Sequence, residues 1–143
     1  MRTQTTSRCL IIQGDSIILC KHLAGNYYFL PGGGLELGET LNQCITRELN
    51  EEMGVSENDI KIHDGIILAV ENQGYDSKGN FKYGIEVVKR VDVNVQNIVC
   101  QEDLIDFDKI KISDLPNIKL YPESIKNWLI ETLIKGDKNE TVD

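Results

Sequence analysis

The stretch Gly33–Val55, GGLELGETLNQCITRELNEEMGV, constrains the fold of this chain more than any other segment. Thr40–Gln43 fits the capping-box pattern at a helix start, and Gly54 is placed as a left-handed C-terminal cap. Apolar residues recur at helical spacing between these two signals. The spacing predicts a helix over Leu41–Met53. The run Gly32–Gly34 before it predicts a loop whose backbone another group approaches closely.

The predicted helix carries three glutamates on its inner side. Glu48 and Glu52 fall inside the apolar stripe, and Glu51 borders it. Like charges at this spacing repel, and the helix dipole disfavours negative charge in the last turns. Arg47 offsets only part of this repulsion. A hard divalent cation offsets more, and Mg²⁺ prefers a few carboxylates together with waters and substrate phosphates.

Two common phosphate-binding motifs do not fit the glycine run. The residues Gly33–Thr40 nearly match GxxxxGK[ST], but Glu39 stands where the motif needs a lysine. A carboxylate there would repel the phosphates, which excludes a P-loop. The dinucleotide pattern GxGxxG fails because Leu37 stands at its last glycine.

The segment resembles the Nudix box, G-x5-E-x7-R-E-U-x-E-E-x-G-U with U an apolar residue. Every defined position is filled, by Gly33, Glu39, Arg47, Glu48, Leu49, Glu51, Glu52, Gly54 and Val55. The resemblance to the Nudix hydrolase family implies an α/β fold, the α/β/α sandwich with a central mixed sheet. It also implies hydrolysis of a nucleoside diphosphate linked to another group, with Mg²⁺ or sometimes Mn²⁺ as cofactor.

The resemblance assigns roles to the box residues. Glu51 and Glu52 would bind the metal, with Glu48 as a further ligand or hydrogen-bond partner and the Gly32 carbonyl as an extra ligand. Arg47 would orient the glutamates. The remaining box carboxylate, that of Glu39, would be an outer ligand or a structural support.

Other site residues lie outside the box glutamates. In parts of the family the general base comes from another loop, and the acidic candidates here are Glu102, Asp103 and, more weakly, Glu86 and Glu71. The candidate substrate-binding residues are Gly33, Gly34 and Tyr28. Subfamily signatures downstream of the box are absent, which leaves nucleoside triphosphates, nucleotide sugars and other diphosphates open. The alternative function is a Nudix-fold sensor that binds a nucleotide or metabolite without cleaving it.

The flanking sequence predicts strands on both sides of the helix. Residues 1–7 are interpreted as frayed or as a strand lead-in. Expected strands are Arg8–Ile12, Ser16–Lys21, Tyr27–Leu30, Ile60–Ile62 with Ile66–Glu71 (as one bent strand, with a bulge at Gly65), Phe81–Val95 and Leu104–Ile110. Expected loops are Asn72–Asn80 and Gln96–Asp103. A second amphipathic helix is expected from Pro122 to Lys135.

Bulk properties set the remaining expectations. The 143 residues predict one domain over 1–135 and a disordered tail over 136–143. The net charge of −8 argues against a nucleic-acid partner. The four separated cysteines argue against a zinc site, and the absence of long apolar runs argues against a membrane partner. We expect a reduced, cytoplasmic protein that acts on a small molecule, and the family resemblance leaves a homodimer open.

Overall fold

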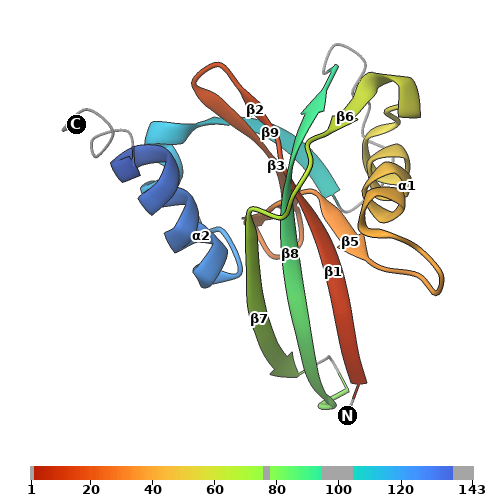
Figure 1. Ribbon diagram of the computed structural model, residues 1–143. Coiled ribbons are helices and arrows are strands. Elements are labelled where there is room, and N and C mark those ends of the chain that lie inside the picture. Colours follow the sequence, from red (N-terminus) through yellow and green to blue (C-terminus); the bar gives the residue numbers. More distant parts are fainter. Residues whose placement is uncertain (1, 76–77, 95–104, 137–143) are drawn as a thin grey trace.

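The structure is a computed structural model that describes residues 2–75, 78–94 and 105–136. Two helices and nine strands form its frame (Figure 1). The strands are β1 (Arg2–Leu10), β2 (Ile12–Gln13), β3 (Ser16–His22), β4 (Tyr27–Phe29), β5 (Gly32–Gly34), β6 (Ile60–Ile62), β7 (Leu68–Tyr75), β8 (Phe81–Val93) and β9 (Ile105–Lys111). The helices are α1 (Leu41–Met53) and α2 (Glu123–Leu129). A π-helical turn, η4 (Ile130–Lys135), continues α2, and two 3-10 turns are η1 (Glu57–Asp59) and η3 (Ile112–Asn117).

The strands form two sheets, of which the first has mixed pairing and the second is antiparallel. In the first, β1 and β8 run parallel, β5 pairs antiparallel with β1, and both β6 and β7 pair antiparallel with β8. In the second, β3 pairs antiparallel with β2, β4 and β9. The parallel β1–β8 pair puts two strands far apart in sequence at the centre of the first sheet.

The two helices lie on opposite sides of the strands (Figure 1). Alternate residues of a strand point to opposite faces, so β1 and β3 each contribute side chains to two separate hydrophobic cores. Cys9 and Ile18 pack with the α1 residues Ile45, Leu49 and Met53. Leu10, Ile17 and Leu19 pack instead with Ile125 and Leu129 of α2. This arrangement confirms the expected α/β/α layering with a mixed sheet.

Local signals determine where α1 begins and ends. The Thr40 side chain accepts a hydrogen bond from the Gln43 backbone, and the Gln43 side chain accepts one from the Thr40 backbone. Gly54 closes the helix at φ 66, a left-handed conformation that favours glycine. The predicted range Leu41–Met53 is confirmed.

Two strands are longer than the sequence predicts. β1 begins at Arg2, not at Arg8, because its polar first half pairs with β8 from Lys82 onward. β7 continues to Tyr75, so the predicted loop is wrong for residues 72–75, which pair with β8. The polar side chains and glycine in these segments do not indicate a strand. In both cases backbone hydrogen bonds to β8 stabilise the strand.

The predicted loop at Gly32–Gly34 is also wrong. These residues form β5, whose partners on β1 are Thr6, Ser7 and Arg8. A Cβ atom on Gly32 would lie 2.0 Å from the Ser7 carbonyl oxygen. The glycines therefore let the edge strand pack closely against β1. This agrees with the prediction that another group approaches the backbone of Gly32–Gly34 closely.

The expected bent strand around Gly65 is two strands. β6 and β7 pair with the same partner, β8, with Ile62 opposite Val91 and Leu68 opposite Val88. The intervening segment interrupts the pairing, and Gly65 adopts φ +87 within it.

The remaining predictions concern the last strand, the second helix, the cysteines, a membrane span, a loop and the tail. The final strand, β9, and the second helical segment agree closely with their predicted ranges. Cys9, Cys20 and Cys44 are free and buried. In the described part of the chain, no helix has the length and apolar character needed to cross a membrane. The predicted loop Gln96–Asp103 and residues 137–143 of the predicted tail lie outside the described residues, whereas Gly136, the first residue of that tail, is helical.

Candidate active site

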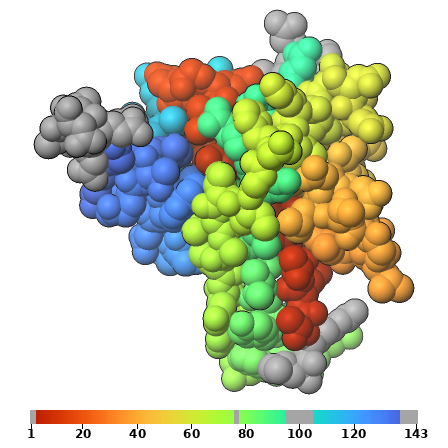
Figure 2. Space-filling view, viewed as in Figure 1, coloured from red at the N-terminus to blue at the C-terminus, as the bar shows by residue number. Residues whose placement is uncertain are grey.

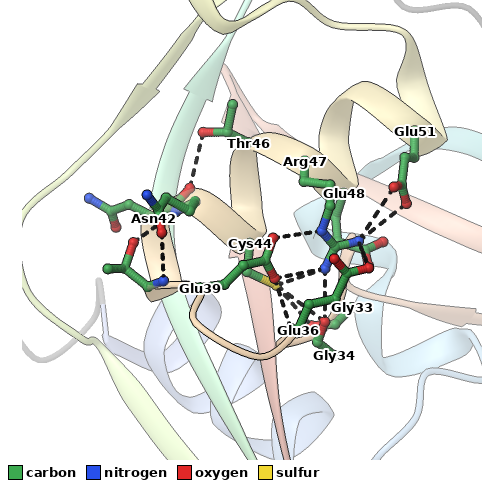
Figure 3. Close-up of polar contacts among 12 residues, drawn as sticks. Gly33, Gly34, Glu36, Glu39, Asn42, Cys44, Thr46, Arg47, Glu48 and Glu51 are labelled. Atoms are coloured by element: carbon green, nitrogen blue, oxygen red, sulfur yellow. Dashed lines mark hydrogen bonds and ion pairs between the residues drawn. The ribbon is translucent and has the colours of Figure 1, made fainter.

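Arg47 is the centre of the polar contacts around the box (Figure 3). Its guanidinium donates two parallel hydrogen bonds to Glu39, Nε to Oε2 at 2.6 Å and Nη2 to Oε1 at 2.9 Å. It also donates to Glu48 Oε1 at 2.9 Å and to the Gly34 carbonyl at 3.0 Å. The closest contact with Glu51, four residues along the helix, is 3.3 Å. One planar cation thus ties the helix to the β5 edge strand.

Glu39 fastens the connection between β5 and α1. Hydrogen bonds from Arg47 and from the Glu36 backbone lower the pKa of Glu39 to about 2. The Glu36 amide donates to Glu39 Oε1 at 2.8 Å. Glu39 therefore stays ionised and holds the loop against the helix, which fits the structural support that the sequence suggests for it.

Glu52 is the most buried carboxylate of the box, with 3% of its surface exposed. Its Oε1 accepts a hydrogen bond from the Gly32 amide at 3.2 Å, and its Oε2 accepts one from the Cys20 thiol at 3.5 Å. Burial, with the Glu48 charge as a second cause, raises the pKa of Glu52 to about 8. A positive charge placed beside this carboxylate would stabilise its ionised form and lower its pKa again.

The Glu48 carboxylate lies directly over Gly33. A Cβ atom on Gly33 would be 2.3 Å from the Glu48 carboxyl carbon. Burial raises the pKa of Glu48, while the hydrogen bond from Arg47 opposes the shift. Only a residue without a side chain leaves room for this carboxylate against the edge strand.

The donor set suits a hard divalent cation. Glu48 and Glu52 face inward as the periodicity predicts, and the Gly32 backbone hydrogen-bonds to Glu52. Within the described ranges, no group of three acidic, histidine or cysteine side chains is already arranged around a common metal position. Arg47 holds Glu51, whose side chain is 50% exposed and can turn at little cost. Carboxylate oxygens and a backbone carbonyl are ligands that Mg²⁺ accepts.

Two cavities lie along the strands, and neither is lined by the box glutamates, by Arg47 or by Gly32–Gly34. The larger, about 610 Å³, runs along β1, β7 and β8. The smaller, about 460 Å³, is bounded by Arg8, the aromatic side chains Tyr27, Phe29 and Tyr121, and the start of α2. Asn72 and Glu86 line both cavities. Figure 2 shows β7 at the surface between α2 on one side and β1 with α1 on the other.

Arg8 and Glu86 form a part-buried ion pair at these cavities. Arg8 Nε donates to Glu86 Oε1 at 2.8 Å, and Asn72 Nδ2 donates to Glu86 Oε2 at 2.8 Å. Glu86 is 2% exposed. Sequence reasoning considered Glu86 only as a weak candidate base and missed Arg8 and Asn72. The available signal was Glu86, a glutamate among the apolar residues of the predicted strand Phe81–Val95.

The other predicted residues lie in varied places. The Tyr28 hydroxyl donates to Asp108 Oδ2 at 2.7 Å, which raises the pKa of Tyr28 to about 12. Its neighbours Tyr27 and Phe29 line the smaller cavity and Tyr28 does not, because adjacent strand residues face opposite ways. Gly33 and Gly34 lie on β5 beside Arg47 and Glu48. Glu71 is exposed on β7. Glu102 and Asp103 lie outside the described residues.

Comparison with known proteins identifies the family. The model of the NUDIX domain matches residues 2–127. The chain belongs to the Nudix hydrolase family. A curated relative, the nucleoside triphosphatase NudI of Enterobacter sp. (strain 638), is 40% identical over 57 residues. That match covers 36% of this chain and 40% of the relative, so the chain spans about two fifths of the length of that protein.

Solved Nudix structures share the fold. A MutT protein from Bacillus halodurans superposes with a TM-score of 0.66 at 17% identity, covering 92% of this chain and 82% of that one. A UDP-X diphosphatase gives a TM-score of 0.69 at 19% identity, covering 96% of this chain and 65% of the other. At these identities the likeness concerns the fold alone.

Proposed function

We propose that this protein is a Mg²⁺-dependent pyrophosphohydrolase that cleaves the diphosphate link of a nucleoside diphosphate derivative. The observation that carries the proposal is the set of Glu48, Glu51 and Glu52 beside the Gly32–Gly34 edge strand, with Glu52 buried and without a cationic hydrogen-bond partner among the described residues. Family membership supports a hydrolase of this kind. The name of the curated relative, a nucleoside triphosphatase, supports a nucleotide substrate.

The residues of the chain have distinct parts in the proposed reaction. Glu48, Glu51, Glu52 and the Gly32 carbonyl would hold Mg²⁺, or Mn²⁺ in its place, and Arg47 would keep the glutamates in position. The ion, when bound, supplies charge neutralisation of the diphosphate and a lower pKa for water. Water attacks phosphorus, the anhydride P–O bond breaks, and a carboxylate accepts the proton. Glu102 stays our candidate for that base, and Gly33, Gly34 and Tyr28 stay candidates for substrate contacts.

A substrate panel tests the proposal. Nucleoside triphosphates, nucleotide sugars and dinucleoside polyphosphates are incubated with the full chain and Mg²⁺, and the products are identified by chromatography. We expect turnover of at least one nucleotide and a loss of roughly 100-fold or more in Glu52→Gln. Lys61→Gln, an exposed change on β6, is the control. No turnover across the panel, or full activity in Glu52→Gln, would reject the proposed hydrolase.

A further inference from the structure

We propose that Arg8 is a phosphate-binding residue of this site. Its guanidinium contacts phosphoryl oxygens of the substrate that the box glutamates do not reach, and Glu86 and Asn72 orient it. The inference rests on the proposed function for the identity of the ligand. Arg8 lies on β1, outside the Nudix box.

Arg8 is the β1 residue paired with Gly32, and the Gly32 amide donates to Glu52. Arg8 and Glu52 are close enough to interact electrostatically. Arg8 also lines the cavity of about 460 Å³. A ligand held at the box glutamates reaches the guanidinium if it extends past Gly32 into that cavity.

The Arg8 guanidinium donates two hydrogen bonds to described residues. Nε donates to Glu86, and Nη1 donates to the Leu30 carbonyl at 3.1 Å. Nη2 makes no hydrogen bond to another described residue, and the side chain is 20% exposed. The guanidinium carbon lies 5.7 Å from the centre of the Phe29 ring. Glu86, Leu30 and Phe29 thus hold the side chain, and Nη2 is without a hydrogen-bond partner among the described residues, which suits it to a phosphate.

The chain has a net charge of −8, and the proposed substrate carries several negative charges. Arg47, the cation of the box, is already engaged with four carboxylates. Of the described residues that line the two cavities, Arg8 and Lys82 are the lysine and arginine side chains. Arg8 is the one next to the box.

Glu86 and Asn72 act through Arg8. Glu86 is buried and accepts from Arg8 with one oxygen and from Asn72 with the other. Both carboxylate oxygens are engaged, so Glu86 holds the guanidinium plane. In this arrangement Glu86 is a positioning residue.

The test compares Arg8→Ala and Arg8→Lys with Arg90→Ala. Arg90 lies on β8, is partly exposed and lines neither cavity. With the full chain and Mg²⁺, we expect kcat/KM for the best nucleotide to fall about 100-fold in Arg8→Ala and about tenfold in Arg8→Lys. Arg90→Ala should stay within about threefold of the wild type, because exposed ion pairs contribute little.

Chemical rescue separates binding from a purely structural role. Added guanidinium ion at low millimolar concentration should restore Arg8→Ala several-fold, and it should not improve Glu86→Gln, which keeps its arginine. Mg²⁺–pyrophosphate affinity, measured by calorimetry, should fall about tenfold or more in Arg8→Ala and stay unchanged in Arg90→Ala. Unchanged pyrophosphate affinity in Arg8→Ala, or an activity loss that guanidinium does not rescue, overturns the inference.

The calorimetric arm also separates the two proposals. If the wild type cleaves no nucleotide but binds Mg²⁺–pyrophosphate through Arg8, the proposed hydrolysis fails and the phosphate site stands. If nucleotides are cleaved and Arg8→Ala behaves like Arg90→Ala in both measurements, the phosphate site fails and the hydrolase stands.

Discussion

At the residue scale, Gly33 shows how a missing side chain shapes the site. The space where its Cβ would stand holds the Glu48 carboxylate. Because that carboxylate is the mobile end of a long side chain, a methyl group at Gly33 would displace it without disrupting the backbone. The fold and the position of Glu48 can therefore be separated by one substitution.

Gly33→Ala should keep the protein folded and remove most of its activity. We expect a loss of roughly tenfold to 100-fold in kcat/KM, as for a misplaced catalytic group, and a change in unfolding free energy below about 1.5 kcal/mol. Hydrolysis assays and urea denaturation measure the two effects. Gly74→Ala, at a glycine with open space around it, is the matched control. Full activity in Gly33→Ala would contradict the role given to Glu48.

The Arg47–Glu39 pair predicts a pH dependence of stability. The pKa of Glu39 falls from 4.5 to about 2 in the folded protein. A lowered folded-state pKa contributes stability that is present above pH 4.5 and is lost as the pH falls through about 2. Glu39→Gln should therefore be less stable than the wild type at pH 7, and the difference should shrink towards pH 2.

Urea denaturation at a series of pH values measures this effect. Glu57→Gln, an exposed glutamate of η1, is the control and should follow the wild type throughout. If the loss of unfolding free energy in Glu39→Gln stayed constant from pH 7 to pH 2, the charge of Glu39 would not contribute to stability.

At the scale of elements, α1 and β5 form in different ways. The cap residues and apolar spacing of α1 stabilise the helix locally, so its limits follow from its own sequence. β5 consists of three glycines, which have low strand propensity. It is a strand because β1 offers a free edge, and because α1 and Arg47 hold it there.

The capping box of α1 should contribute measurably to stability. Thr40→Ala removes the acceptor for the Gln43 amide and should cost about 1 kcal/mol of unfolding free energy. Thr40→Ser keeps the hydroxyl and should cost much less. Thermal and urea unfolding of the two variants measure the difference. Equal stability of the alanine and serine variants would contradict the contribution of the cap.

At the scale of the whole molecule, the two cores hold the site from both sides. One core packs α1 against the strands, and the other packs α2. The box glutamates lie at the α1 side, while the smaller cavity reaches the start of α2. The site therefore depends on both layers, and its stability is coupled to that of the whole domain.

Metal binding should stabilise the domain through Glu52. In the metal-free protein the pKa of Glu52 is raised from 4.5 to about 8, so the folded state binds more protons than the unfolded state between these values. Stability should therefore decrease as the pH rises across that window. Mg²⁺ at about 100 times its dissociation constant should add about 2.7 kcal/mol.

Differential scanning calorimetry with chelator or with Mg²⁺ measures this linkage. Glu52→Gln should weaken the decrease with pH and should respond little to Mg²⁺. Glu57→Gln should keep the wild-type response. A melting temperature that is independent of Mg²⁺ in the wild type would contradict the assignment of the metal site.

The sequence by itself determined α1, its caps, the inward direction of Glu48 and Glu52, and the family. These depend on residues close together in the chain, where helical spacing and capping act locally. The tertiary structure alone decided that Gly32–Gly34 is a strand, that β1 begins at Arg2 and β7 ends at Tyr75, and that Arg8 meets Glu86. The physical reason is that pairing with β1 and β8 comes from distant parts of the chain. The register of those strands, which local sequence does not encode, places Arg8 opposite Gly32, whose amide donates to Glu52.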